Sequence, residues 1–300
     1  MALLLAEQAN PSGLHSSPPL EHFSPCTPTL GSFREAVSDL VAEVGECAPA
    51  DARAAEHILA NRLGEDEIAT VLEETPDGWD ATVARLLFEV RNYEPTPQNA
   101  TTTLASLVRI SLLSQIDAVW WGREPCYLTD SDLAAAMDLV DLDELNADKQ
   151  LTFRYRHQAV TLLGRAARSA ERHTMPRRRP KTAGILLALA RPQVVAWLND
   201  VAEEFAEVAP DGTPPLWVTS VARSVDHQRH LKALGYIAPL PSSHCVGYAA
   251  DIEMKWYRRY RAHRLLRGLL LDRQRAHEIN VIDEGQAWHV CLRPDLVASS

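Results

Sequence analysis

The chain has 300 residues, of which 46% are hydrophobic and 23% charged, and its formal net charge is -10 at pH 7. This composition is typical of a globular protein with one large domain or two ordinary ones, and the negative charge argues against a general nucleic-acid-binding protein. Residues 1–6 are too short and too uncharged for a signal peptide. Charged residues interrupt the most apolar stretch, 104–119, so we expect no membrane span.

The first half of the chain predicts helices. Residues 1–31 are expected to form a disordered arm, because 8–31 are rich in Pro, Ser, Thr and His and have no hydrophobic period. Ser32-Phe33-Arg34-Glu35 has the capping-box pattern that begins a helix. Further helices are expected at about 50–63, 66–74, 79–93, 101–121, 133–140 and 148–173. Because 32–173 lacks strand-like alternation, we predict an all-α domain of about six helices there.

The second half predicts alternating helices and strands beyond a basic linker at 174–184. Helices are expected at about 183–208, 226–234 and 256–278, and strands at about 216–221, 247–253, 279–282 and 287–292. The expected fold class is α+β, with a small, mostly antiparallel sheet in a domain covering 185–300. We expect Trp120 and Trp121 to pack in the core or at the domain interface.

Two other features of the composition have simple interpretations. The helix expected at 256–278 carries seven arginines, which we interpret as a solvated face paired with the acidic N-terminal domain, the alternative being a surface for an anionic polymer. The five cysteines are odd in number and lack a CxxC spacing, which favours reduced thiols and a cytoplasmic location. Cys245 and Cys291 are expected to be small buried residues, with soft metal ligation as the alternative.

The residues that carry chemistry gather around 242–251. His244 and Asp251 lie seven residues apart, and His289 follows downstream. Two histidines and one carboxylate, with a fourth position open, form the ligand set of a catalytic zinc site. We therefore predict that these three residues bind zinc, and that Gly247 lets the backbone pass close to the metal. A lone histidine is more often a structural residue, so the prediction depends on the motifs around it.

Three motifs resemble those of the zinc D-Ala-D-Ala carboxypeptidase and dipeptidase family. They are Ser220-x-x-Arg223-Ser224-x-x-x-Gln228, Ser242-x-His244-x-x-Gly247-x-Ala249-x-Asp251 and Trp288-His289. The resemblance covers residues 185–295 and implies a small antiparallel sheet with one zinc ion. It also implies a small peptide substrate that contains D-amino acids or comes from the bacterial cell wall.

The resemblance implies a role for each matching residue. His244, Asp251 and His289 would be the zinc ligands. Arg223 would stabilise the oxyanion of the tetrahedral intermediate or hold a substrate carboxylate, for which a planar, permanently charged guanidinium is suited. Ser242 would lie beside the site against the substrate backbone. Gln228 would support the loop that carries Arg223, so all three motifs would contribute to one site.

One position departs from the family's pattern. The family's general base is a glutamate three residues before the last histidine, and here that residue is Gln286. A neutral amide orients water but cannot accept its proton, and strand geometry is not expected to place Asp283 or Glu284 at that position. Three interpretations stay open: Glu284 substitutes through a bend at Gly285, the reaction differs, or the site binds metal and ligand without turnover. Residues 281–286 are similar to an uncharacterised bacterial branch that also carries Gln here.

The predicted function is therefore that of a zinc-dependent peptidase-like protein that hydrolyses a small peptide, with Arg223, Glu284 and Gln286 as the candidate catalytic residues. The alternative is an inactive, zinc-bearing pseudo-peptidase that binds a peptide or cell-wall fragment. A third option is an interaction protein in which the helical domain is the functional part. The first two require His244, Asp251 and His289 to converge within about 4 Å of a common point, because zinc–ligand distances are about 2 Å.

Overall fold

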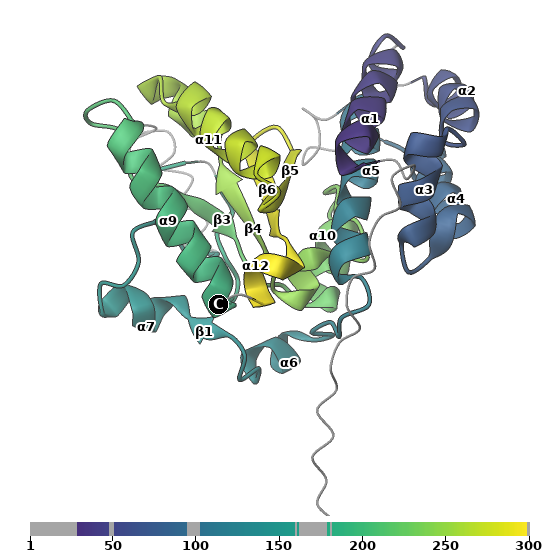
Figure 1. Cartoon of the computed structure of the whole chain (residues 1–300). Coiled ribbons are helices and arrows are strands. Elements are labelled where there is room, and N and C mark those ends of the chain that lie inside the picture. Colours follow the sequence, from purple (N-terminus) through teal and green to yellow (C-terminus); the bar gives the residue numbers. More distant parts are fainter. Residues whose placement is uncertain are drawn as a thin grey trace, which may run out of the picture.

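The computed structural model describes residues 29–47, 51–94, 103–159, 161, 179–180 and 182–298. Within them the chain is α+β, with two small antiparallel sheets, so this coarse part of the predicted fold class is confirmed (Figure 1). The predicted arm lies outside the described residues up to position 28, as does most of the predicted linker. Within the described part of the chain, no helix is long and apolar enough to cross a membrane.

Five helices of the N-terminal half form one group, which we call the helical unit: α1 (Leu30–Gly45), α2 (Ala52–Arg62), α3 (Asp66–Glu74), α4 (Gly78–Arg91) and α5 (Leu104–Trp121). They bury a shared apolar core that includes Phe33, Leu40 and Leu112. The predicted capping box at Ser32 is wrong, because α1 begins earlier. Its cap is Thr29, whose side-chain oxygen accepts a hydrogen bond from the backbone N–H of Ser32 at 3.2 Å.

The segment after the helical unit is not all-α. It contains α6 (Asp130–Ala134), β1 (Val140–Asp141) and α7 (Leu142–Ala147), and β1 pairs with β2 (Leu189–Ala190). The predicted helix at 148–173 is wrong over its described part, where Arg154 and His157 form isolated bridges to Trp217 and Ile185. The reason is an alternation of Leu151, Phe153 and Tyr155, all of which pack into the core under the main sheet.

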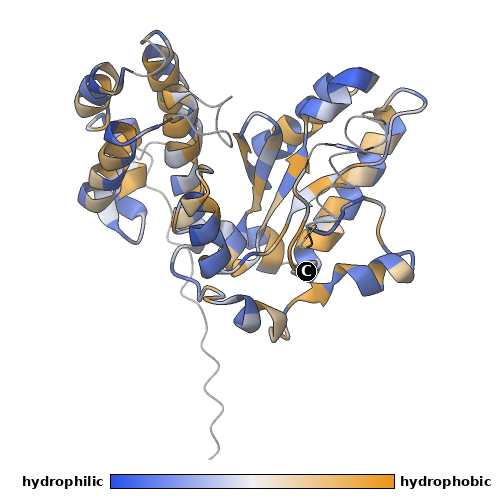
Figure 2. Cartoon of the chain, turned by 180° about the vertical axis from the view of Figure 1, so that it is seen from behind, coloured by the Kyte–Doolittle hydropathy of each residue, from blue (hydrophilic) through white to orange (hydrophobic). Residues whose placement is uncertain are grey.

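The main sheet has four antiparallel strands in the order β3-β4-β6-β5, namely β3 (Val218–Ser220), β4 (Ala249–Glu253), β6 (Ala287–Leu292) and β5 (Ile279–Asp283). One face packs against α9 (Pro192–Val208) and α11 (His263–Arg275) through side chains such as Ile252, Trp288 and Val290. In Figure 2 the hydrophobic colour follows these strands and the inner sides of the helices. Because side chains alternate along a strand, Asp251 and His289 belong to the opposite face.

The remaining elements of the C-terminal half are short: α10 (Val225–Ala233), the 3-10 helices at Ser243–Val246 and Lys255–Tyr260, and α12 (Pro294–Ala298). Two predicted helices are shorter than expected. The helix at 183–208 begins only at Pro192, a residue suited to the first helical turn. The helix at 256–278 is divided at Arg261, whose φ of 59° belongs to the left-handed region and ends the 3-10 helix.

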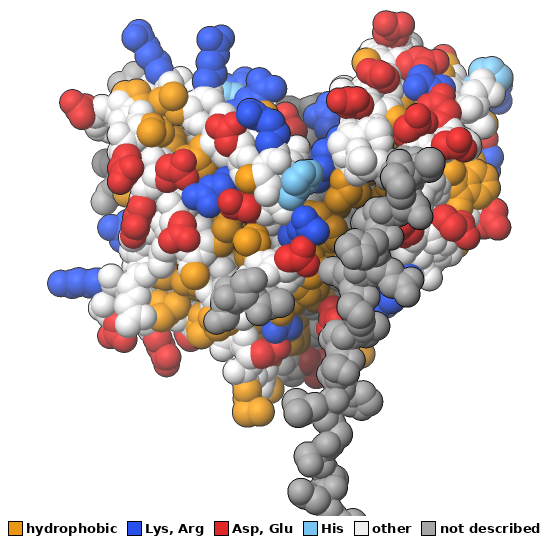
Figure 3. Space-filling model, in the orientation of Figure 1, with side chains coloured by type: hydrophobic (Ala, Val, Ile, Leu, Met, Phe, Trp, Pro, Cys, Tyr) orange, Lys and Arg blue, Asp and Glu red, His pale blue; other side chains and the backbone are white. Residues whose placement is uncertain are grey.

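Two arginines of the arginine-rich stretch form ion pairs with acidic residues of the C-terminal half, and pairing of the other arginines with the acidic N-terminal domain stays a prediction. In the described residues Arg273 forms ion pairs with Glu204 of α9 and with Glu278, and Arg275 pairs with Asp272 one helical turn away. Lys and Arg side chains project from the upper edge of the molecule, over α11 (Figure 3). The outward direction of these side chains is consistent with a solvated helix face.

Helix α5 joins the helical unit to the second face of the sheet (Figure 1). The indole Nε1–H of Trp121 donates to the carbonyl of Leu292 at 2.7 Å, and its ring stacks on Tyr248 with centroids 3.8 Å apart. Near the other end of the helix, Arg109 donates to the carbonyl of Asp283 at 3.3 Å. The prediction that Trp121 packs at an interface is therefore confirmed, and α5 covers the sheet face that carries Asp251 and His289.

We expect Trp121→Phe to lower the free energy of unfolding by about 1–2 kcal/mol, because it leaves a buried carbonyl without its donor. Urea denaturation measures this loss. Trp79→Phe is the matched control, since its Nε1–H donates to the carbonyl of Leu63 at 3.0 Å inside the helical unit. The control should cost a similar amount without loosening α5 from the sheet. An unchanged unfolding midpoint for Trp121→Phe would contradict the inferred docking.

Candidate metal centre

Three side-chain atoms from three segments meet on the face of the sheet under α5. His244 Nε2 lies 3.0 Å from Asp251 Oδ1 and 3.1 Å from His289 Nδ1, and the last two atoms are 3.2 Å apart. Ligands at about 2.0–2.2 Å from a tetrahedral ion are about 3.3–3.6 Å from one another. The triangle is therefore within a few tenths of an ångström of a metal-ligand triangle, and all three residues are buried.

The backbone brings these ligands together by strand pairing and by a tight turn. Asp251 of β4 and His289 of β6 are directly opposite each other in the antiparallel register, which places their side chains side by side. His244 comes from the 3-10 helix Ser243–Val246, which ends at Gly247 with φ of +85°. A Cβ at Gly247 would lie 3.1 Å from the side chain of Arg191. The turn and this contact, rather than closeness to a metal, explain the glycine.

In each of the three residues, one polar atom is hydrogen-bonded to a neighbouring group, and the other polar atom faces the common point. His244 Nδ1 donates to the carbonyl of Val221 at 2.7 Å, so its Nε2 carries the lone pair. His289 Nε2 donates to Asp117 Oδ2 at 2.8 Å, which leaves Nδ1 for a ligand. Oδ2 of Asp251 accepts a hydrogen bond from the Arg223 guanidinium, so Oδ1 is the oxygen that faces the common point. Such hydrogen bonds to the far side of each ligand are typical of metal sites, so the donor set fits zinc.

The electrostatics of the metal-free site differ between the two histidines. Burial, assisted by the charge of Arg223, lowers the pKa of His244 to about 4, so this ring is neutral at pH 7. Burial also disfavours charge on His289, but its bonds to Asp117 and Asp251 and their charges raise its pKa to about 10. Burial would raise the pKa of Asp251, yet His244 and Arg223 hold it well below its usual value. A proton on His289 Nδ1 thus occupies the place that a metal would take.

Each of the three guanidinium nitrogens of Arg223 has a partner at the edge of this cluster. Its Nε donates to Ser220 Oγ at 2.6 Å, one terminal nitrogen donates to Gln228 Oε1 at 3.1 Å, and the other binds Asp251. Gln228, expected to support the Arg223 loop, donates in turn to the carbonyl of Pro239 at 3.2 Å. These bonds fix the orientation of the guanidinium. Its contact with the carboxylate of Asp251 is one that the motif alone did not indicate.

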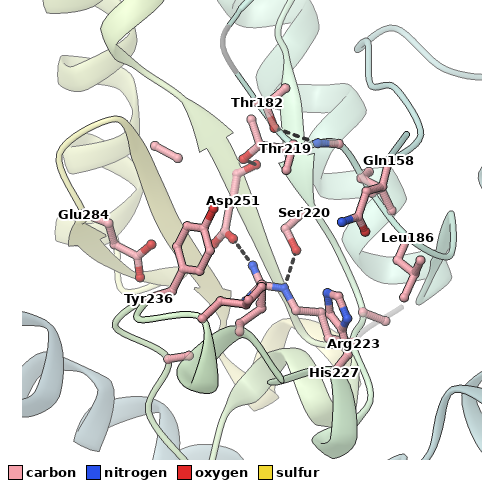
Figure 4. A pocket seen from close by; sticks show the side chains of 18 of the residues that line it. Gln158, Thr182, Leu186, Thr219, Ser220, Arg223, His227, Tyr236, Asp251 and Glu284 are labelled. Carbon is pink, nitrogen blue, oxygen red and sulfur yellow. Dashed lines mark hydrogen bonds and ion pairs between the residues drawn. The ribbon is translucent and has the colours of Figure 1, made fainter. Parts of the chain in front are cut away.

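Two cavities meet at the cluster. The larger, of about 640 Å³, extends from Asp251 past Thr219 and Ser220 and toward His227 and Tyr236 (Figure 4). The smaller, of about 40 Å³, lies against the metal-ligand triangle and is lined by Ser242, the predicted substrate contact. Both cavities are lined by Arg223 and Glu284. These two residues therefore stand between the candidate metal position and the space in which a substrate would lie.

The β5–β6 hairpin decides which acidic residue reaches this junction. The N–H of Glu284 donates to the carbonyl of Ala287 at 3.2 Å, and Gly285 has φ of +88°. Glu284 is therefore opposite Ala287 and shares a face with His289, whereas Asp283 pairs with Trp288 on the other face. Neither acid was expected at the position of residue 286, and substitution by Glu284 through a bend at Gly285 was one open interpretation. The structure directs Asp283 to the other face and lets Glu284 line both cavities, which agrees with that interpretation.

Glu284 and Gln286 have different surroundings. Burial, with the charge of Asp251, raises the pKa of Glu284 to about 7, while His289 and Arg223 oppose the rise. Its carboxyl projects into the larger cavity (Figure 4). Gln286 is exposed, and its Nε2 donates to Glu253 Oε2 at 3.4 Å. The residue at the family's usual base position is therefore directed at a buried carboxylate, and Glu284 is the acid beside the metal ligands.

Sequence reasoning missed the residues behind His289. Asp117 of α5 accepts hydrogen bonds from His289, from Ser243 Oγ at 2.8 Å and from Asn280 Nδ2 at 2.9 Å. In the sequence, Asp117 only interrupts the apolar stretch 104–119. A buried acid in an otherwise apolar helix is itself a signal, because an unpaired buried charge is costly. Its partner, however, is 172 residues away in the chain, so no local pattern identifies it.

We expect zinc affinity to increase by about tenfold per pH unit between about pH 6 and 8, because binding must displace one proton from His289. His289 stays protonated below its metal-free pKa of about 10, so the competing proton becomes scarcer as the pH rises. Competition with a chelator of known pH dependence measures this slope. A Kd for zinc that does not change with pH would contradict the inferred protonation of the metal-free site.

The structure thus brings together His244, Asp251, His289, Arg223 and Glu284, while Gln286 lines the larger cavity beside Glu253. The two cysteines near the ligands are buried thiols with raised pKa values, and neither belongs to the cluster. Comparison with known proteins adds no relative: no family model, no curated protein and no solved structure matches the chain.

Proposed function

We propose that the chain is a zinc-dependent peptidase-like hydrolase of small peptides, with a site similar to that of the zinc D-Ala-D-Ala carboxypeptidases and dipeptidases. The observation that supports the proposal is the convergence of three possible ligand atoms, on His244, Asp251 and His289, within 3.2 Å of one another. Zinc, when bound, supplies a Lewis acid that lowers the pKa of a coordinated water toward about 7. The other roles belong to residues of the chain.

Glu284 is the proposed general base. A base works best when its pKa is close to the working pH, and the pKa of Glu284 is raised to about 7. From the junction of the two cavities its carboxylate would take the proton of the attacking water and return it to the leaving amine. This assigns to Glu284 the part that Gln286, a neutral amide, cannot perform.

Arg223 is proposed to hold the oxygen of the substrate. A guanidinium has five N–H donors, and partners within the described residues take three of them. The remaining two would serve the carbonyl oxygen that becomes negative, or a substrate carboxylate, in the larger cavity. The bonds to Ser220 and Gln228 fix the plane of the group before substrate binds, which is how preorganised donors stabilise a transition state.

A second candidate function is a pseudo-peptidase that binds zinc and a peptide without turnover. The observation that favours it is the neutral Gln286 at the family's base position. The two candidates share the metal ligands and Arg223 and differ only in whether Glu284 transfers a proton. A substrate with D-amino acids or from the cell wall follows from the motif resemblance, and the size of the larger cavity is compatible with a small peptide.

We expect the zinc-loaded protein to hydrolyse cell-wall dipeptides such as D-Ala-D-Ala, and Glu284→Gln to lower kcat by about 10²–10⁴-fold, because it removes the proton acceptor. The wild-type rate should fall as the pH drops below about 7, where Glu284 takes up a proton. Elemental analysis first establishes the zinc content, and amine release gives the rate. Gln286→Ala is the matched control: this side chain also lines the larger cavity but cannot accept a proton, so its loss should lower kcat far less than Glu284→Gln does.

The outcomes separate the candidates. Activity that is lost in both His289→Ala and Glu284→Gln supports the hydrolase. Zinc binding without activity, with turnover appearing only in Gln286→Glu, supports the pseudo-peptidase. A protein purified without chelators that holds no zinc and takes up none would overturn both.

A further inference from the structure

Helix α5 inserts one acidic side chain behind the candidate metal centre. Asp117 is only 4% exposed. Its Oδ2 accepts from His289 Nε2 and from Ser243 Oγ, both at 2.8 Å, and its Oδ1 accepts from Asn280 Nδ2 at 2.9 Å. A buried carboxylate without such partners would cost several kcal/mol, so three donors account for its presence in an apolar helix.

The charge of Asp117 is balanced from a second helix of the same unit. Arg34 of α1 donates to Asn280 Oδ1 at 3.1 Å, and the amide of Asn280 donates to Asp117. Burial lowers the pKa of Arg34 to about 10, and the charge of Asp117 opposes this. Arg34 therefore stabilises Asp117 through an intervening amide rather than by direct contact, and both Asp117 oxygens stay available to the sheet.

We propose that Asp117 is a positioning residue for His289, and that the helical unit is therefore an integral part of the metal centre. This inference rests on the proposed zinc site. A carboxylate that accepts the far N–H of a ligating imidazole fixes the orientation and tautomer of the ring and raises its basicity. In this chain the carboxylate comes from a helix outside the region that carries the three motifs.

The contacts of α5 explain how Asp117 is held in place. Trp121, four residues along the helix, is bonded to Leu292, and Leu113 on the preceding turn accepts from Asn280 at 3.0 Å. These contacts fix both the rotation and the axial position of α5 on the sheet. A shift of α5 by one residue would rotate Asp117 by about 100° about the helix axis and remove it from His289.

The test uses the full chain and two readouts. Asp117→Asn keeps the shape and one acceptor but removes the charge, and it should raise the Kd for zinc by about 10–100-fold. It should also shift the visible absorption bands of the cobalt-substituted protein, which report the ligand field. Gln115→Leu is the control: Gln115 is similarly buried on α5, and its amide donates to the carbonyl of Ser111 and to Ser114 Oγ. Ser243→Ala removes the other donor to the same oxygen and should have a smaller effect.

A further measurement does not need metal. In the 15N-labelled metal-free protein, the Nε2–H of His289 should give a slowly exchanging signal, identified by its loss in His289→Gln. The signal should persist in Gln115→Leu and disappear in Asp117→Leu, with circular dichroism confirming that the variant is folded. Equal zinc Kd and unchanged cobalt spectra in wild type and Asp117→Asn would overturn this inference and leave the proposed function standing. A wild type that binds no zinc would overturn both.

Discussion

The site depends above all on the register between β4 and β6. Asp251 and His289 are paired directly across these strands, on the face that does not contribute to the main core. A slip of one residue would turn Asp251 into the apolar core and bring Ile252 to the site. The core itself opposes that slip, because Ile252, Trp288 and Val290 are buried against α9 and α11. Packing on one face therefore holds the ligand geometry on the other.

The same sheet face concentrates charge where water is scarce. Asp251 and Asp117 carry negative charge, and Arg223 and Arg34 carry positive charge, in an arrangement where each group has a defined hydrogen-bond partner. Such a network stabilises a structure when its members are satisfied, and among these four side chains the buried Nε of Arg34 is without a hydrogen-bond partner within the described residues. Since His289 lies between the two carboxylates, it attracts either a proton or a metal ion. Binding of a divalent metal at this position would displace one proton, so the site would gain one positive charge instead of two.

The sequence predicts local features of this chain well and distant ones poorly. The strands β4 and β6 and the convergence of His244, Asp251 and His289 follow from short motifs whose spacing matches strand geometry. The extended segment around Phe153 was mistaken for a helix, because its alternation is only three apolar residues long and is followed by residues at helical spacing. Asp117 was missed because its meaning depends on a helix docking onto a sheet far away in the sequence.

The position of Glu284 shows why spacing along a chain is an unsafe guide near a hairpin. Counted back from His289, Gln286 occupies the family's base position, yet residues three apart on a straight strand point to opposite faces. Which residue returns to the site face is decided by the turn. Here Gly285, with its left-handed backbone, places Glu284 opposite Ala287. Glu284 therefore lies on the same face of the sheet as His289. A turn of different length would reverse the two residues without altering any metal ligand. The position of Glu284 and the triangle of His244, Asp251 and His289 are thus specified by separate parts of the structure, the hairpin turn and the strand register.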